Sequence, residues 1–140
     1  MIDSALIMRH TASEMDPPRR TIEGLPAPIV DVLRATLDPE ESVTHVVSAI
    51  GCALVLTNRR LLLIREGSAF RPRTGVRDWP IGPDLAVQAG LVRQGTGSLV
   101  IRSERDVTSV FVRADRWDDA LDLVGAVRGR VRQARTRGRR

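Results

Sequence analysis

Lysine and tyrosine are absent from this 140-residue sequence, and cysteine occurs once. All 22 basic residues are arginine, which excludes lysine-based covalent catalysis and the lysine of a phosphate-binding loop. Such a composition is typical of a GC-rich genome; selection for bidentate anion recognition would instead require arginines clustered at one site. Cys52 alone cannot form an internal disulfide or supply metal-ligand spacing. Because it follows Gly51 at an expected strand start, a small buried thiol is favoured over a reactive one.

Aromatic residues and long apolar runs are also scarce. The four aromatic side chains are Phe70, Trp79, Phe111 and Trp117. So few rings argue against a stacking platform for single-stranded nucleic acid. No apolar run reaches the roughly 18 residues of a membrane span, and the 6–8 patch is too short for a signal peptide. We therefore expect a cytoplasmic protein without a transmembrane segment.

The positive charge is concentrated after residue 127. The formal net charge is +5. Seven arginines and no acidic residue lie within 128–140, whereas residues 1–127 carry 15 arginines and 17 acidic residues. This distribution predicts a nearly neutral domain followed by a basic segment whose contacts would be sensitive to salt.

The length suits one domain, and the pattern divides the chain into three parts. Residues 1–24 are polar and contain Pro17-Pro18, which predicts a flexible N-terminal arm. Residues 25–133 are expected to form the domain, and 134–140 a basic tail. Apolar residues at helical spacing, with Pro28 in the first turn and Pro39 beyond the end, predict a short helix over about 28–37.

Strand patterns fill about 43–113. The clearest is a hairpin of strands 52–57 and 60–65 around Asn58-Arg59, whose unbroken apolar character predicts that both faces are covered. Other strands are expected at 43–50, 75–81, 84–92, 98–102 and 107–112. Pro80 places its strand at an edge or strand end, and Gly95-Thr96-Gly97 is expected to form a turn.

Helical spacing returns over about 114–133. The expected buried stripe comprises Trp117, Ala120, Leu121, Val124, Val127 and Val131. Acidic residues occupy the opposite side, at Asp115, Asp118, Asp119 and Asp122. They fit a solvated helix face matched to the helix dipole better than a metal site. The whole pattern predicts an α+β fold: about seven antiparallel strands, in sheets of four and three, capped by a C-terminal amphipathic helix.

The segment Leu54–Ile64 resembles the hairpin of bacterial pleckstrin-homology-like (PH-like) domains. In that hairpin an apolar strand ends in Thr, an Asn/Asp-Arg-Arg turn follows, and a second apolar strand returns. Gly97–Ile101 and the passage from Val110 to Leu121 are similar to the rest of that pattern. The resemblance covers roughly 40–133 and implies a PH-like barrel, a fold that hosts lipid, peptide and oligomerisation functions. Lipid-binding members carry basic residues on the first two strands, whereas Ile50-Gly51-Cys52 carries none. At the turn, the resemblance implies structural roles for Arg59 and Arg60.

No catalytic constellation is visible in the sequence. His10 falls in the arm, His45 is expected on a sheet face, and Glu40-Glu41 is expected at the solvated surface. Without a paired nucleophile and base, a metal-ligand spacing or a cofactor motif, we expect a protein that is not an enzyme.

The leading hypothesis is a binding or assembly module that engages a protein partner or a second copy of itself. The pattern around the third loop favours a solvated loop; the alternative is an anion-binding group that comprises Arg65, Arg71, Arg73 and Arg77. The alternative function is peripheral binding to anionic membrane or nucleic acid, without sequence preference, through the basic segment. Its candidate residues are Arg130, Arg132, Arg135, Arg137, Arg139 and Arg140.

Overall fold

The computed structural model describes residues 22, 24–67 and 75–138. The expected arm, 1–24, therefore lies outside the described residues except for Ile22 and Gly24. The elements in chain order are α3 (Ala27–Thr36), β1 (Val43–Ala49), β2 (Cys52–Thr57), β3 (Arg60–Arg65), β4 (Val76–Pro80), β5 (Ala86–Ala89), β6 (Thr96–Arg102), β7 (Val107–Arg113), the 3₁₀ turn η2 (Ala114–Arg116) and α4 (Trp117–Gly138).

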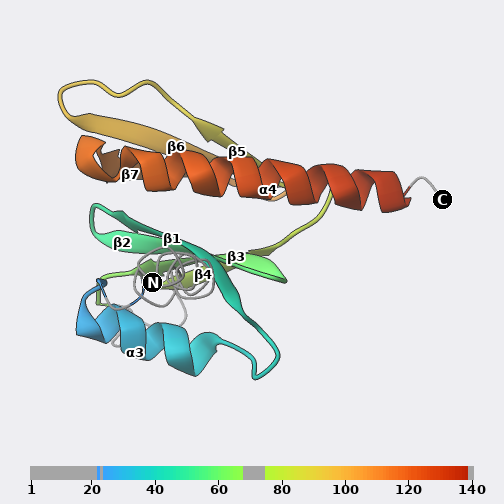
Figure 1. The fold of residues 1–140 in the computed structure, drawn as a ribbon, viewed down its shortest axis with the longest axis horizontal. Helices are drawn as coiled ribbons and strands as arrows, with labels where there is room; N and C mark the ends of the chain where they lie inside the picture. The colour runs from blue at the N-terminus through green and yellow to red at the C-terminus, as the bar shows by residue number, and fades with distance from the viewer. Residues whose placement is uncertain (1–21, 23, 68–74, 139–140) are drawn as a thin grey trace, which may run out of the picture.

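The first sheet has the order β1-β2-β3-β4, with every neighbouring pair antiparallel. The predicted hairpin is confirmed at both strands, and the Asn58 side chain accepts a hydrogen bond from the Ser42 backbone N–H (2.8 Å). Pro80 is the last residue of the edge strand β4, as predicted. Both faces of this sheet are covered, because α3 lies on one side and α4 on the other (Figure 1).

The second sheet has the order β5-β6-β7. The tight turn before β6 is centred on Gln94-Gly95, where both residues have positive φ (53° and 79°). Such angles fit a two-residue hairpin turn that matches the twist of antiparallel strands. The predicted turn at 95–97 was therefore placed too late: Thr96 starts β6 and Gly97 pairs with Val112.

One hydrophobic core joins the inner faces of both sheets to α4. Its sheet contributions include Leu54, Leu61, Leu99 and Val112, all nearly or fully buried. A second cluster lies on the outer face of the first sheet, where Ile29 and Leu33 of α3 pack. The apolar character of β2 and β3 on both faces follows from these two clusters.

Helix α4 differs from the predicted helix in its stripe and in its length. Leu123 is fully buried, whereas Leu121 is 45% exposed, so the predicted place of Leu121 in the stripe was wrong. The residues that α4 does bury are Ala120, Leu123, Val124, Val127 and Val131. The helix also continues to Gly138, beyond the predicted end at about residue 133. Ala134 and the arginines are good helix formers, and positive charge suits a helix C-terminus.

The sheets meet at one corner, where the Ile50 N–H donates to the Phe111 carbonyl (2.8 Å). Elsewhere in the described part of the chain, the sheets remain separate in their strand pairing. The α+β class, with antiparallel sheets of four and three strands and two flanking helices, is confirmed. None of the described helices is long and apolar enough to cross a membrane.

Candidate functional site

A groove of about 230 Å³ lies between β5 and α4. Its lining comprises Leu85, Ala86, Val87, Gln88, Val127, Arg128, Val131, Arg132 and Arg135. β5 pairs with β6 on one side, and no other described strand pairs with it. An unpaired edge presents backbone N–H and C=O groups that another extended chain can satisfy.

The groove combines an apolar floor with a basic wall. Val87, Val127 and Val131 are buried below it, while Arg128 and Arg132 are exposed on α4. Arg135 is also exposed, and its guanidinium donates to the Pro83 carbonyl at 3.2–3.3 Å. This contact fixes the segment that leads into β5. The groove therefore offers an edge strand, apolar surface and positive charge within one site.

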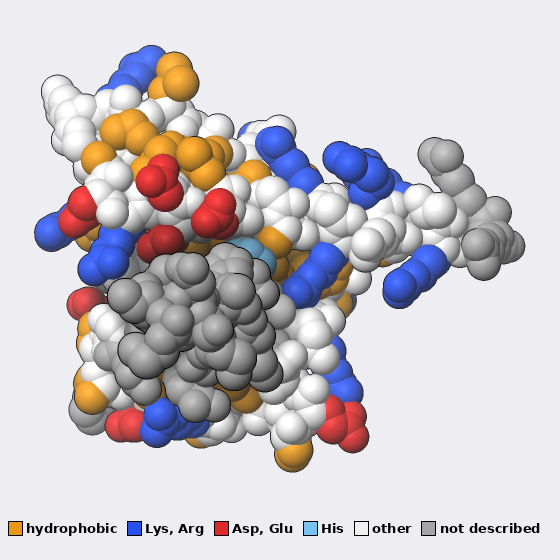
Figure 2. Space-filling model, viewed as in Figure 1, with side chains coloured by type: hydrophobic (Ala, Val, Ile, Leu, Met, Phe, Trp, Pro, Cys, Tyr) orange, Lys and Arg blue, Asp and Glu red, His pale blue; other side chains and the backbone are white. Residues whose placement is uncertain are grey.

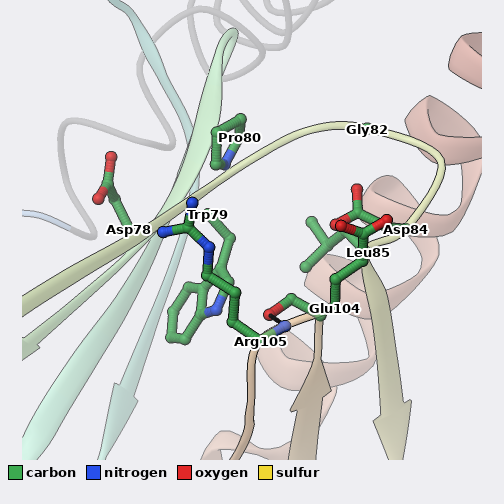
Figure 3. A pocket seen from close by; sticks show the side chains of 9 residues that line it. Asp78, Trp79, Pro80, Gly82, Asp84, Leu85, Glu104 and Arg105 are labelled. Carbon is green, nitrogen blue, oxygen red and sulfur yellow. Dashed lines mark hydrogen bonds between the residues drawn. The ribbon is translucent and has the colours of Figure 1, made fainter.

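A larger cavity of about 440 Å³ opens beside Trp79, between the end of β4 and the β6–β7 turn (Figure 3). Asp78 lies on the other side of Trp79 from Asp84 and Glu104 (Figure 3). Asp78 also pairs with Arg60 at 3.2 Å. The three carboxylates therefore do not converge on one point (Figure 3).

A third hollow, of about 540 Å³, lies where the β1–β2 turn meets the end of β7. Glu66, Arg113, Asp115 and Arg116 give it charges of both signs. Ile50 belongs to its rim and is 53% exposed. Mixed charge without a buried polar group gives this hollow no evident ligand chemistry.

The structure describes two of the four arginines that were predicted as an anion-binding group, and the surroundings of these two differ. Arg71 and Arg73 lie outside the described residues, and Arg65 is exposed at the end of β3. Arg77 donates to the Thr108 hydroxyl (2.8 Å), pairs with Asp106 and lies over the Trp79 ring at 5.1 Å. Its charge is compensated within the protein, where it joins β4 to β7. The structure therefore gives Arg77 a structural role.

The arginines predicted as contacts of the basic segment also differ from one another in burial and in their hydrogen bonds. Arg130 is half-buried and donates to the Thr57 carbonyl and to the Thr44 hydroxyl (3.1 Å), which ties α4 to the first sheet. Burial lowers the pKa of its guanidinium. Arg132, Arg135 and Arg137 are exposed on helix α4. Arg139 and Arg140 lie outside the described residues.

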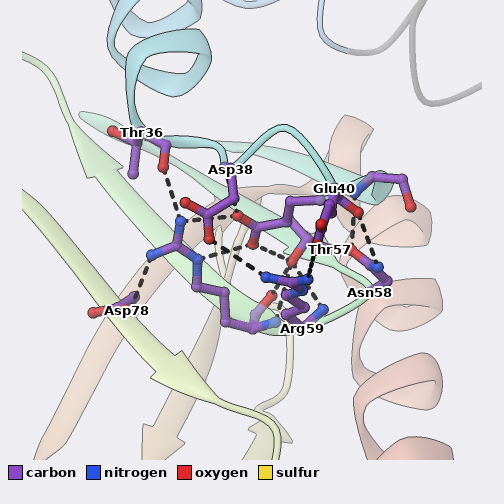
Figure 4. A network of polar contacts seen from close by, with 10 residues as sticks. Thr36, Asp38, Glu40, Thr57, Asn58, Arg59 and Asp78 are labelled. Carbon is purple, nitrogen blue, oxygen red and sulfur yellow. Dashed lines mark hydrogen bonds and ion pairs between the residues drawn. The ribbon is translucent and has the colours of Figure 1, made fainter.

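A polar network surrounds the β2–β3 turn (Figure 4). Glu41 was predicted at the solvated surface, but its side chain is buried and accepts two hydrogen bonds from Arg60 (2.8 and 2.9 Å). Arg60 also donates to the Thr36 carbonyl (2.9 Å), and Arg59 pairs with Glu40 (2.6 Å). Arg60 therefore has a structural role, whereas the ion pair of Arg59 is exposed. The pKa of Arg60 is raised, chiefly by its hydrogen bond to Glu41.

The remaining titratable side chains of the described residues do not gather at one site. His45 is half-buried on β1, where desolvation lowers the pKa of its imidazole. Burial raises the pKa of the Cys52 thiol to about 11, which suits a packed rather than a reactive cysteine. Within the described ranges, no three His, Cys, Asp or Glu side chains are grouped so that they could hold a metal ion.

Comparisons of the chain with protein-family models, with curated proteins and with solved structures gave no significant match.

Proposed function

We propose that this chain is a non-catalytic binding and assembly module with a PH-like fold, and that the groove between β5 and α4 is its protein-binding site. The observation that carries the proposal is the unpaired edge of β5 beside an apolar floor and three arginines. A cytoplasmic location accords with this function.

The PH-like fold is supported by three features. The strands divide four and three in chain order, α4 packs against both sheets, and the turn after β1 meets β7 through Ile50 and Phe111. A helix that contributes to the core of both sheets closes their open side, as in a capped barrel. The resemblance of Leu54–Ile64 to the PH-like hairpin points the same way.

The chemistry of the groove favours an extended, acidic protein segment. Backbone groups of such a segment would pair with the edge of β5, and alternate side chains would reach Val87, Val127 and Val131. Carboxylates on the segment would pair with Arg128, Arg132 or Arg135.

The test uses a ten-residue peptide that alternates valine with glutamate, and a second peptide with glutamine in place of glutamate. Binding to the full chain is measured by fluorescence anisotropy. We expect the glutamate peptide to bind more tightly, and Arg135→Gln to weaken its binding by about twofold to fivefold, the usual effect of one exposed charged contact.

Arg137→Gln is the matched control, because Arg137 is an exposed arginine of the same helix that does not line the groove. Equal loss with the two variants, equal affinity for the two peptides, or no binding of the glutamate peptide would overturn the groove as the site.

A second candidate function is peripheral binding to an anionic surface, favoured by the exposed arginines that α4 carries beyond its last buried residue, Val131. Each arginine near such a surface contributes at most about 1 kcal/mol. Co-sedimentation with anionic and neutral vesicles at low and near-physiological salt tests this function. Binding to anionic vesicles alone, reduced equally by Arg135→Gln and Arg137→Gln, would support it; no binding at low salt would exclude it.

A further inference from the structure

The solvent-facing side of α4 carries an ordered stripe of residues. Counted along the helix, the stripe comprises Asp118, Leu121, Asp122, Gly125, Arg128, Gly129 and Arg132. Spacings of three and four place these residues on one face. All are exposed except the half-buried Gly129, and the buried residues of α4 occupy the opposite face. The stripe is therefore a surface and not part of the core.

The charges on this stripe are divided by sign about Gly125. Both acids precede it and both arginines follow it. Figure 2 shows the same division, with acidic side chains over the first half of α4 and basic side chains toward its C-terminal end. The helix dipole favours this order, but it accounts only for the charges.

A twofold axis through Gly125 makes the stripe complementary to itself. If a second copy packs its α4 antiparallel to the first, Asp122 faces Arg128 and Asp118 faces Arg132, and each pair occurs twice. Contacts between identical patches of this kind are the usual basis of homodimers. Parallel packing would instead oppose like charges.

The apolar and small residues of the stripe fit the same arrangement. Leu121, which is 45% exposed, would pack on Gly129 of the second copy, and the two Gly125 residues would meet at the axis. A Cβ atom added at Gly125 or Gly129 would meet no atom within 4 Å, so neither glycine is required by packing inside the chain. Glycine is a poor helix former, and a close approach of two helices explains its presence twice on this face.

We infer that the chain forms a homodimer through antiparallel packing of this face of α4 against a second copy. The inference rests on the assembly part of the proposed function and names its partner. Two short helix faces form a small interface, so the dimer is weak, and its ion pairs make it sensitive to salt.

Sedimentation equilibrium of the full chain, at protein concentrations up to about 1 mM and at low and high salt, measures the dimer. We expect a monomer–dimer equilibrium that weakens as salt rises. The charge-reversed variants D118R/D122R and R128D/R132D should each be monomeric, since each homodimer would then oppose like charges. An equimolar mixture of the two should dimerise, because every pair in the heterodimer is again of opposite sign.

Two further variants separate pairing from folding. Gly125→Leu should raise the dimer dissociation constant at least tenfold without loss of helical circular dichroism, since the site has open space within one chain. R113D/R137D is the matched control: both arginines are exposed and lie off the stripe, so this variant should dimerise like the unmodified chain.

A monomeric unmodified chain at about 1 mM would overturn the inference. So would a mixture of the charge-reversed variants that stays monomeric, or a control variant that loses the dimer. Arg128 and Arg132 belong to both the groove and the stripe, so the peptide and the second copy compete for them; glutamate-peptide binding to Gly125→Leu, in which the dimer is weakened and the groove lining is unchanged, reports on the groove alone. Loss of the dimer with intact peptide binding would confirm the α4 surface, whereas failure of peptide binding alone would count against the groove only.

Discussion

Glu41 has both carboxylate oxygens engaged inside the protein. One oxygen accepts from the Asp38 backbone N–H (3.1 Å) and from Arg60, and the other accepts from the Thr57 hydroxyl (2.6 Å) and again from Arg60. The two contacts to Arg60 are bidentate, which is the strongest geometry for such a pair. Glu41 therefore fastens the segment before β1 to the β2–β3 turn.

This environment makes stability depend on pH. Hydrogen bonding to Arg60, opposed in part by burial, lowers the pKa of Glu41 from 4.5 to about 2. Because the folded pKa is lower than the unfolded one, the stabilisation is complete above about pH 4.5 and is lost as pH falls toward 2. We expect Glu41→Gln to reduce the free energy of unfolding at pH 7 by about 3 kcal/mol.

Urea unfolding of the two proteins from pH 7 to pH 2 measures this effect, and the difference between them should shrink below pH 4.5. Glu40→Gln is the control, because Glu40 is exposed and its pair with Arg59 should contribute less than about 1 kcal/mol. A difference independent of pH would contradict the role given to the Glu41 carboxylate.

Gly97 lies under the indole ring of Trp117. A Cβ atom there would come within 2.5–2.8 Å of three ring atoms. We expect Gly97→Ala to cost about 1–3 kcal/mol, because the ring must move away from β6. Thermal unfolding and tryptophan emission, to which Trp79 and Trp117 both contribute, report the change. Gly129→Ala, where space is open, should instead leave stability unchanged or raise it by up to about 1 kcal/mol.

The contacts of single residues such as these are the features that the sequence predicts least well. Glu41 and Arg60 are 19 positions apart, and Arg77 and Thr108 are 31 apart. Periodicity describes neighbours along the chain and carries no information about such pairs. The burial of Glu41 and the structural role of Arg77 therefore depend on the fold and could not be predicted.

At the scale of elements, local pattern is a better guide. The β2–β3 hairpin was predicted to the residue because Asn58-Arg59 separates two unbroken apolar runs. α4 was harder. Both Leu121 and Leu123 are compatible with the spacing of Ala120 and Val124, and the angle at which α4 meets the two sheets decides between them.

These two leucines provide a matched comparison on one helix. We expect Leu123→Ala to cost about 2–5 kcal/mol, since its side chain is fully buried in the main core. Leu121→Ala should change stability by no more than about 0.5 kcal/mol when measured on dilute protein. Urea unfolding followed by circular dichroism checks both, and equal costs would contradict the orientation of α4 described above.

For the whole molecule, the sequence pattern predicted the division into sheets of four and three strands and the helix that packs against both. It also located the positive charge, but it placed the end of the last helix too early: α4 continues to Gly138 and not only to about residue 133. Helix propensity explains this continuation, and the described part of the basic segment, up to Gly138, is a helical projection.

Deleting residues 133–140 tests how separable that projection is. The deletion removes four of the 22 arginines, and the last buried residue of α4, Val131, remains. We expect the free energy of unfolding to fall by less than about 1 kcal/mol, because only exposed helix and the contact of Arg135 with Pro83 are lost. A cooperative thermal transition close to that of the full chain confirms this; loss of the transition would show that the projection is part of the core structure.

The position of α4 along the chain has a consequence for synthesis. Because α4 follows all seven strands that the structure describes, its buried residues reach the core only after both sheets have been translated. Until then, Leu54, Leu61 and Leu99 of the inner faces lack the helix that covers them. A nascent chain that stalls before residue 120 would present two bare apolar sheet faces, which is the kind of surface that leads to aggregation and that chaperones exist to contain.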